Sequence, residues 1–322
     1  MENKPRAYFW LALATTLLLV VSGATLFARQ GGSERNGDVA LPQAPLQPLA
    51  SHDDAARMSE KSAHSTPVVE RAFPPLPDKD TPLIDVFQDL RNRMAQGDLE
   101  AGDRLFENMK QCRWRDAWVN YGVNYAVHST ANADEDELRR LEGRLDYAQH
   151  IQKFCRDMDE AQLKQLVPVM LEAARHGVRR ARTCYLYRGP MMDVEALLEH
   201  PEYLTTYRDE ASRLIEQGLS DGDWRIVDML QYAYGYRNPR ATISGVIKND
   251  PIEHYRYLKL FRIGADEFMQ ADLDQRLARA REALSVDAAA AADAWAIDMA
   301  ARNFKGSSTQ AAPQGWDACG PD

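Results

Sequence analysis

A long apolar run near the N-terminus sets where the rest of this chain is placed. From Ala7 to Ala28 the sequence carries no charged residue. A helix of roughly 22 residues, rising about 1.5 Å per residue, spans about 33 Å and matches the ~30 Å hydrocarbon core of a bilayer. Lys4 and Arg6 precede the run and Arg29 follows it directly. This pattern predicts a cytoplasmic N-terminus at residues 1–6, a single transmembrane anchor at residues 7–28 and an exported remainder.

A cleaved signal peptide is the alternative interpretation of the same run. Ser22, Gly23 and Ala24 are small residues of the kind found at a cleavage point. The run nevertheless continues through Leu26 and Phe27, and it is longer than the core of about 7 to 15 residues in an ordinary signal peptide. We therefore favour the retained anchor. Both interpretations place the rest of the chain outside the cytoplasm.

The segment from residue 29 to residue 82 has the composition of a linker. Its prolines lie among Gly, Ser, Gln and Ala with no sustained helical or strand period, at positions 42, 45, 48, 67, 74, 75, 77 and 82. A flexible chain of this length has a root-mean-square span of roughly 40 Å. We expect a disordered tether that lets the following domain move away from the membrane.

Composition and charge narrow the class of protein. Hydrophobic residues make up 45% of the chain and charged residues 27%, which is typical of a globular protein. The formal net charge of −9 argues against nucleic-acid binding, because a protein that displaces counterions from phosphates normally has a basic surface. We expect no nucleic-acid partner.

From Thr81 onward the apolar residues recur with a helical period. Thr81 and Pro82 can start a helix that carries Leu83, Leu90 and Met94 on one face. A second helix ends near Cys112, a third holds Trp114, Trp118 and Tyr121, and a fourth begins after Asp134. Further helices are predicted at about 160–176, 179–188, 202–217, 223–236, 251–263, 267–284 and 287–303. The sequence thus predicts an all-α domain over residues 83–304, followed by a tail at 305–322.

Glycines punctuate these helices at a repeating interval. Gly97, Gly177, Gly222 and Gly264 are separated by about one or two lengths of a helix-pair repeat. We expect each of them to end a helix in a left-handed conformation, with a small residue nearby that lets the next helix approach closely.

Two motifs occur in these helices: the stretch from Gly245 to Asp250, followed by Tyr255, Tyr257 and Gly264, and the sequence Ala-Ala-x-x-Gly at residues 173–177. Both resemble motifs of the Sel1-like family, a relative of the tetratricopeptide repeats. The resemblance is good over residues 205–265. It implies a stack of helix pairs, an α-solenoid with a concave surface, used for scaffolding and for protein partners rather than for catalysis. Together with the anchor it implies an inner-membrane protein of the bacterial envelope with a periplasmic domain.

The chain has four cysteines, and we expect them to form disulfides in an oxidising compartment. Four cysteines allow three pairings. We favour Cys112 with Cys155, at the ends of two predicted helices, and Cys184 with Cys319, which would pin the C-terminal tail. Free buried thiols are the alternative. The Cys-x-x-Cys spacing of a redox or zinc site is absent from the sequence.

Catalytic motifs are missing from the sequence. The histidines are scattered without a His-Glu-x-x-His pattern, and neither a Gly-x-Ser-x-Gly elbow nor a phosphate-binding loop occurs. The acidic runs at 134–137 and 221–223 lack the ligand spacing of a calcium loop, and helix caps explain them better. We therefore expect a protein that is not an enzyme and that uses no cofactor or metal.

Two groups of residues are candidates for binding a partner. The first combines large amphipathic rings with cations, a composition enriched at binding hot spots: Tyr232, Tyr236, Arg237, His254, Tyr255 and Arg256. The second is a basic cluster beside Arg175: Arg179, Arg180 and Arg182. Packing between helices is the alternative for the aromatic group, and a solvated helix face is the alternative for the arginines.

These observations favour a tethered scaffold that binds an envelope protein or peptide. The alternative is a cell-wall glycan-binding or glycan-processing protein that uses a carboxylate in its groove. A purely structural spacer is a third interpretation. A catalytic groove would need two acidic residues close together in a pocket, whereas a binding module would present an open aromatic and arginine face.

Overall fold

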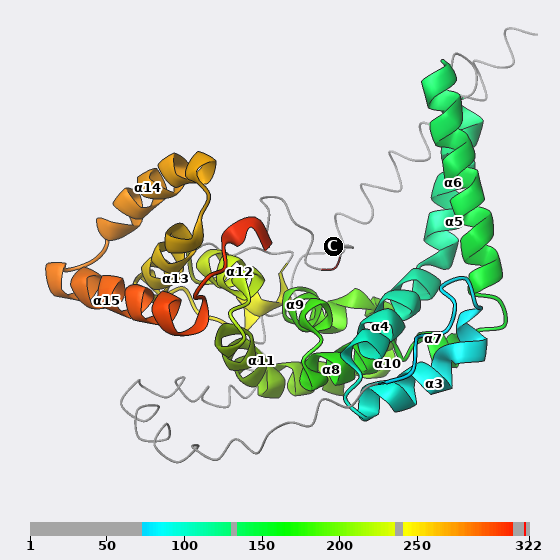
Figure 1. Cartoon of the computed structure of the whole chain (residues 1–322), viewed down its shortest axis with the longest axis horizontal. Coiled ribbons are helices and arrows are strands. Elements are labelled where there is room, and N and C mark those ends of the chain that lie inside the picture. The colour runs from blue at the N-terminus through cyan, green and yellow to red at the C-terminus, as the bar shows by residue number, and fades with distance from the viewer. Residues whose placement is uncertain (1–72, 130–133, 236–240, 312–318, 320–322) are drawn as a thin grey trace, which may run out of the picture. The chain divides into compact units, whose positions relative to one another are not determined.

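The computed structural model describes residues 73–129, 134–235, 241–311 and 319, all within one compact unit (Figure 1). Over these residues the structure contains helices and no strand, so the all-α prediction is confirmed there. The predicted anchor at residues 7–28 and most of the predicted linker lie outside this part of the chain. Within it, no helix is both long and apolar enough to cross a bilayer.

The described chain begins with a helix pair, α3 (Leu83–Ala95) and α4 (Leu99–Arg113). Leu90 and Met94 of α3 and Leu105 of α4 are fully buried in their shared core. Gly97 ends α3 with a φ of 92°, and the Asp98 carboxylate caps α4 by accepting the Ala101 N–H at 3.1 Å. Both features follow from the Gly-Asp pair, because glycine tolerates the left-handed turn and aspartate satisfies an unpaired N–H of the first helical turn.

The end of the predicted linker is packed against this helix pair. Arg93 donates hydrogen bonds to the carbonyls of Pro74 and Pro75, at 2.6 and 3.2 Å. Arg104 donates to the carbonyls of Pro77 and Asp78, at 2.7 and 2.6 Å. The chain therefore contacts the helical unit from Pro74 onward, earlier than the boundary at residue 82 that the proline content suggests.

Two long helices, α5 (Arg115–Ser129) and α6 (Glu135–Phe154), form a hairpin that extends away from the other helices (Figure 1). We call residues 115–154 the arm. The Asp134 carboxylate caps α6 by accepting the Glu137 N–H at 2.8 Å. Gly122 of α5 faces α6, and an added Cβ there would make an ordinary van der Waals contact with the Ala148 Cβ at 3.6 Å.

The middle of the unit repeats the helix-pair pattern. Its elements are α7 (Glu160–Leu163), α8 (Leu166–His176), α9 (Arg179–Tyr187), the 3-10 helix η3 (Gly189–Met192) and α10 (Val194–Glu199). Helix α8 packs against both α4 and α9, and Gly177 between α8 and α9 has a φ of 99°. The sequence does not predict η3 and α10, because such short helices show no complete apolar period.

The last part begins with a third helix pair, which three further α-helices follow. Its elements are α11 (Glu202–Ser220), α12 (Trp224–Gly235), the 3-10 helix η4 (Thr242–Gly245), α13 (Pro251–Gly264), α14 (Glu267–Arg281), α15 (Val286–Asn303) and the 3-10 helix η5 (Thr309–Ala311). Helix α12 packs against α13, and α13 packs against both α14 and α15. The Asp250 carboxylate caps α13 through the N–H groups of Ile252 and Glu253.

The four glycines do not all act alike. Gly97, Gly177 and Gly222 have positive φ, as predicted. The prediction is wrong for Gly264, which is the last residue of α13 and has no positive φ. Glycine fits there for a different reason: an added Cβ would lie 2.4 Å from the Trp224 ring.

Both predicted disulfides are present in the structure. Cys112 bonds to Cys155, joining the end of α4 to the end of α6 at the base of the arm. Cys184 of α9 bonds to Cys319 near the C-terminus. The Lys110 ammonium also donates a hydrogen bond to the Cys319 carbonyl, so α4 and α9 together hold the end of the chain.

Candidate functional site

The basic cluster is made of arginines that are paired with carboxylates on other elements. Arg182 is fully buried, with 0% of its surface exposed, and donates to Asp221 at 2.6 Å and to Asp223 at 3.2 Å. These bonds join α9 to the turn between α11 and α12. Arg182 is therefore a core residue and does not form part of the surface.

The neighbouring arginines are also engaged. Arg180 forms a two-pronged ion pair with Asp103 of α4, at 3.0 and 2.8 Å. Arg175 contacts Glu210 of α11 at 2.7 Å. Arg179 is exposed and makes a long hydrogen bond of 3.4 Å to the Asp221 carbonyl. The cluster thus connects successive helix pairs, and of its predicted binding residues Arg179 is the exposed one.

The described residues of the aromatic group lie in two places: some contact α15, and the others lie where α12, α13 and α14 meet. Tyr255 is buried and its hydroxyl donates to Asp293 of α15 at 3.1 Å. Arg256 pairs with Glu253 and lies over the Trp295 ring of α15, 5.6 Å from the centroid. These two residues face α15 and hold it against α13. Tyr236 and Arg237 lie outside the described residues.

Tyr232 and His254 lie beside a polar cluster at the contact between α12, α13 and α14. Arg276 of α14 covers the partly exposed Tyr232 ring at 4.9 Å and donates to the Gln231 side-chain oxygen at 2.8 Å. His254 Nδ1 is 2.6 Å from the Gln231 carbonyl oxygen. Burial lowers the pKa of His254, which favours its neutral form.

Asp228 completes this polar cluster. Burial raises the pKa of its carboxyl group to about 6, although the hydrogen bond from the Gln231 amide at 2.7 Å and the charge of Arg276 act in the opposite direction. Perturbed carboxyl groups of this kind occur at functional sites and also in structural networks. Here Gln231 donates to Asp228 within α12 and accepts a hydrogen bond from Arg276, so the network connects α12 to α14.

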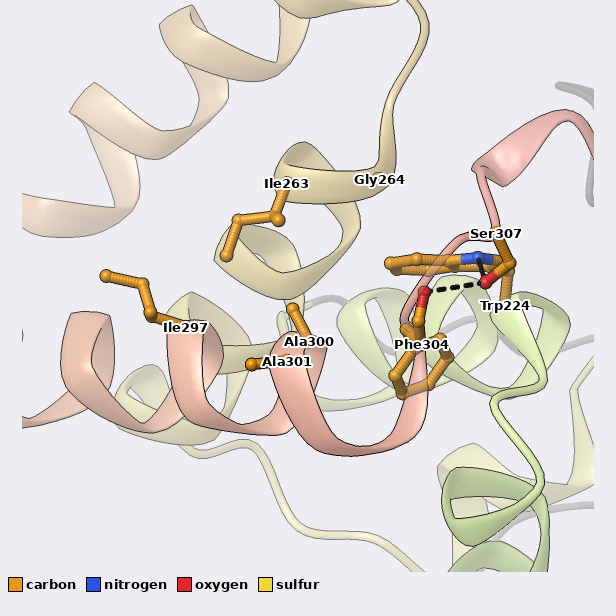
Figure 2. Close-up of a pocket in the computed structure, with 8 residues that line it drawn as sticks. All are labelled: Trp224, Ile263, Gly264, Ile297, Ala300, Ala301, Phe304 and Ser307. Carbon is orange, nitrogen blue, oxygen red and sulfur yellow. Dashed lines mark hydrogen bonds between the residues drawn. The ribbon is translucent and has the colours of Figure 1, made fainter.

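An apolar pocket of about 360 Å³ opens between the end of α13 and the second half of α15 (Figure 2). Its lining residues are Trp224, Ile263, Gly264, Ile297, Ala300, Ala301, Phe304 and Ser307. Ligand pockets are commonly about 300 to 1,000 Å³ and mostly apolar, so this pocket is at the small end of that class. None of these eight described residues carries a carboxylate.

Buried aromatic rings form one end of the pocket. The Trp224 and Phe304 rings are 4.3 Å apart between centroids, and both are almost fully buried. Trp224 Nε1 donates to Ser307 Oγ at 3.0 Å, and Ser307 Oγ donates to the Phe304 carbonyl at 2.9 Å (Figure 2). The indole is thereby fixed in place, since its polar atom is satisfied and its ring edge abuts Gly264.

The remaining lining residues are exposed or small, so this side of the pocket is open to solvent. Ile263 and Ile297 are 41% and 60% exposed. Gly264, Ala300 and Ala301 add little volume between them. Large exposed aliphatic groups beside a rigid aromatic surface favour an apolar group as the occupant.

The sequence patterns do not predict this pocket, although Gly264 belongs to the repeating glycine pattern. The pocket depends on the approach of α15, which brings Ile297 and Phe304 beside Gly264. Nothing in the local pattern of α12 or α13 predicts that approach.

Over the described residues, no group of three or more His, Cys, Asp or Glu side chains is placed to hold a metal ion. Comparisons with protein-family models, with curated proteins and with solved structures find no match to this chain.

Proposed function

We propose that this chain is a membrane-tethered scaffold of the bacterial envelope whose exported Sel1-like domain binds a protein or peptide partner. The observation that carries the proposal is the open apolar pocket between α13 and α15. Its aromatic end is rigid and its aliphatic groups are exposed, so a partner's apolar side chain would bury surface without first ordering the site.

The arrangement of the helices supports the Sel1-like part of the proposal. The pairs α3 with α4, α8 with α9, and α11 with α12 each turn at a glycine of positive φ. Successive pairs also contact one another in chain order. Repeat proteins of this kind contact mainly their neighbours and present extended binding surfaces.

The two disulfides support the proposed location. Disulfides persist in oxidising compartments such as the bacterial periplasm, and they are rare in the cytosol. A periplasmic domain on a single inner-membrane anchor at residues 7–28 is consistent with both bonds.

A peptide-display selection tests the proposal. The full chain in detergent micelles would be the target, and binding of the selected peptides to an Ile297→Arg variant would be measured afterwards. We expect peptides with a large apolar residue, of micromolar affinity, and at least tenfold weaker binding to Ile297→Arg, because the charged side chain would be desolvated in the pocket.

A matched control uses Leu198→Arg, which puts the same charge on another exposed aliphatic residue, 80% exposed on α10. This variant should bind the peptides as the unmodified chain does. Equal binding to all three proteins would refute the pocket as the site. Retention of peptidoglycan fragments in place of peptides would instead favour the glycan-binding alternative.

A further inference from the structure

A short proline-rich segment lies against the first helix pair without being part of a helix. We call residues 73–78 the strap; their sequence is Phe-Pro-Pro-Leu-Pro-Asp, and the structure gives them neither helix nor strand. Proline has no backbone N–H, so the three prolines cannot donate hydrogen bonds, whereas their carbonyl oxygens still need donors. Extended polyproline chains make no internal hydrogen bonds. The strap therefore offers a row of carbonyl acceptors to its neighbours.

Two arginines, which we call the clamp, supply the donors. Arg93 of α3 donates to the carbonyls of residues 74 and 75, and Arg104 of α4 donates to those of residues 77 and 78. The two contact points are three residues apart, which is one turn of a polyproline helix, or about 9 Å. Carbonyls with that spacing lie on the same side of such a helix. The clamp thus matches the repeat of an extended proline-rich chain.

The helix pair itself holds the clamp in position. Arg93 is 8% exposed, and its Nε donates to the Asp98 carboxylate at 2.8 Å. The same carboxylate caps α4 through the Ala101 N–H, so the turn between the helices also orients the guanidinium group. The terminal N–H groups of Arg93 bond to the strap. Because a buried guanidinium that loses its acceptors is costly, this place favours a ligand with carbonyl oxygens.

The contacts define the chemistry of a ligand that fits the clamp. The four hydrogen bonds end on backbone carbonyls, and Pro74 and Pro75 are exposed, so the clamp recognises the backbone rather than these proline rings. Leu76 differs, because its partly buried side chain packs against the hydrophobic core. A helical peptide would not suit the clamp, since its carbonyls are already bonded within the helix. The fitting ligand is an extended proline-rich peptide with an aliphatic residue between its prolines.

We propose that the clamp is a binding site for an extended proline-rich segment of a partner protein, and that the strap occupies this site in cis until the partner's segment replaces it. The site is separate from the pocket, which α12, α13, α15 and Ser307 form. Exchange requires no helix to unfold, because residues 79–82 join the strap to α3. A ligand on so short a connection has an effective concentration in the millimolar range. A free copy of the strap should therefore bind an empty clamp with a dissociation constant below about 1 mM.

Fluorescence polarisation with the full chain in detergent micelles tests the site, and the probe is a labelled peptide that copies residues 70–80. A strap variant carries Pro74→Gly, Pro75→Gly, Leu76→Gly and Pro77→Gly. Its strap should compete poorly, because glycine loses more entropy on docking and the leucine contact is gone. We expect the probe to bind the strap variant, and to bind the unmodified chain at least about tenfold more weakly, since the strap fills most of the clamps there. No binding to the strap variant, or equal binding to both proteins, would overturn the proposal.

Arg104→Ala, added to the strap variant, tests whether the probe lies at the clamp. The change removes two hydrogen bonds from a charged donor, so binding of the probe should weaken at least about tenfold. Arg179→Ala in the strap variant is the matched control, because this exposed arginine lies on α9 and bonds to the Asp221 carbonyl. It should leave the dissociation constant within about twofold. Equal binding by the two variants would place the probe elsewhere and overturn the proposal.

The preference for proline is tested in the probe. A peptide with Pro74→Ala, Pro75→Ala and Pro77→Ala keeps every carbonyl but samples more conformations when free. It should bind the strap variant about tenfold more weakly than the original probe, because it loses more entropy on binding. An alanine peptide that binds as well as the original would show that the clamp does not select proline-rich chains, and would overturn the assignment of the partner.

Discussion

The helices of the first half of the unit are joined to one another by different interactions from those that join the helices of the second half. From α3 to α11, the helix pairs are joined by charged groups that cross between elements, such as Arg180 with Asp103 and Arg182 with Asp223. From α12 to α15, aromatic rings and small residues form the buried contacts, and the ion pairs between helices lie at partly exposed positions, such as Arg262 with Asp274 and Lys259 with Asp293. Trp224 packs against Phe304 and against Gly264, and the buried residues of α15 are alanines.

The difference explains why the pocket occurs in the second half. A buried ion pair fixes the separation of two helices through directional bonds and fills the space between them. Packing of rigid rings against glycine and alanine leaves volume wherever the surfaces do not match. The helices of the first half are therefore held at fixed separations by ion pairs, whereas the packing of the second half leaves space for a ligand.

The largest expected effect comes from removing the disulfide that joins α9 of the first half to the end of the chain beyond α15. The bond between Cys184 and Cys319 closes a loop with a sequence separation of 135. Changing both residues to serine should lower the free energy of unfolding by about 5 kcal/mol in the chain-entropy treatment, measured by urea denaturation. The same change at Cys112 and Cys155, with a separation of 43, should cost about 4 kcal/mol. A greater loss at the shorter loop would contradict this order.

The next largest effect tests the charged contacts of the first half. Arg182→Ala removes the partner of the buried Asp223 carboxylate, and we expect a loss of about 3 kcal/mol in urea denaturation. Arg179→Ala is the matched control, because this exposed side chain makes only a long bond to a backbone carbonyl among the contacts that the structure gives. It should cost less than about 0.5 kcal/mol. Similar losses for both would show that the ion pairs are not what joins α9 to α11.

A smaller effect is expected from the close contact in the second half. Gly264→Ala places a methyl group 2.4 Å from the Trp224 ring, and overpacking of this kind costs about 1 to 3 kcal/mol. The melting temperature should fall by several degrees, and peptide binding at the pocket should weaken. Gly245→Ala is the control, since an added Cβ there meets no atom within 4 Å. If Gly264→Ala had the same melting temperature as the control, the Trp224 ring would be able to move away from the added methyl group at little cost.

The smallest effect is a pH dependence confined to the second half. Because the folded-state pKa of Asp228 is raised to about 6, its neutral form is favoured by folding. The contribution to stability is full below the unfolded-state pKa near 4 and is lost as the pH rises through about 6. We expect unfolding free energies to differ by about 1 to 2 kcal/mol between these limits from this group.

Asp228→Asn isolates that contribution. The variant should lack this part of the pH dependence, so the difference between the two proteins in urea denaturation should change between pH 4 and pH 7 and stay constant above pH 7. A difference that does not vary with pH would mean that Asp228 titrates normally in the folded state.

Much of the fold could be predicted from the sequence because its signals are local. The apolar period of Leu83, Leu90 and Met94 is complete within one helix, and Gly97 and Gly177 mark turns that require positive φ. The cysteine pairs could be predicted because both bonds join helix ends or a tail to a helix. The prediction of a positive φ at Gly264 is wrong, because the role of this glycine depends on Trp224, which is 40 residues earlier in the chain.

The candidate site could not be predicted in the same way. Arginine and tyrosine are amphipathic, so the sequence does not distinguish a buried Arg182 or Tyr255 from an exposed one. Their surroundings come from residues far along the chain, Asp221 and Asp293. The pocket likewise depends on the angle at which α15 meets α13, and no short pattern encodes that angle.

The two disulfides also determine how the chain would respond to mechanical force. If tension were applied between the N-terminal side of α3 and Cys319, it would bypass residues 113–154 and 185–318, because each of these segments is closed by a covalent bond. Only α3, α4, α7, α8 and most of α9 would carry the tension. The bypassed segments represent roughly 600 Å of extended chain that stays unavailable while both bonds are intact. The arm, the pocket and α11 to α15 could therefore remain folded while the oxidised protein is stretched.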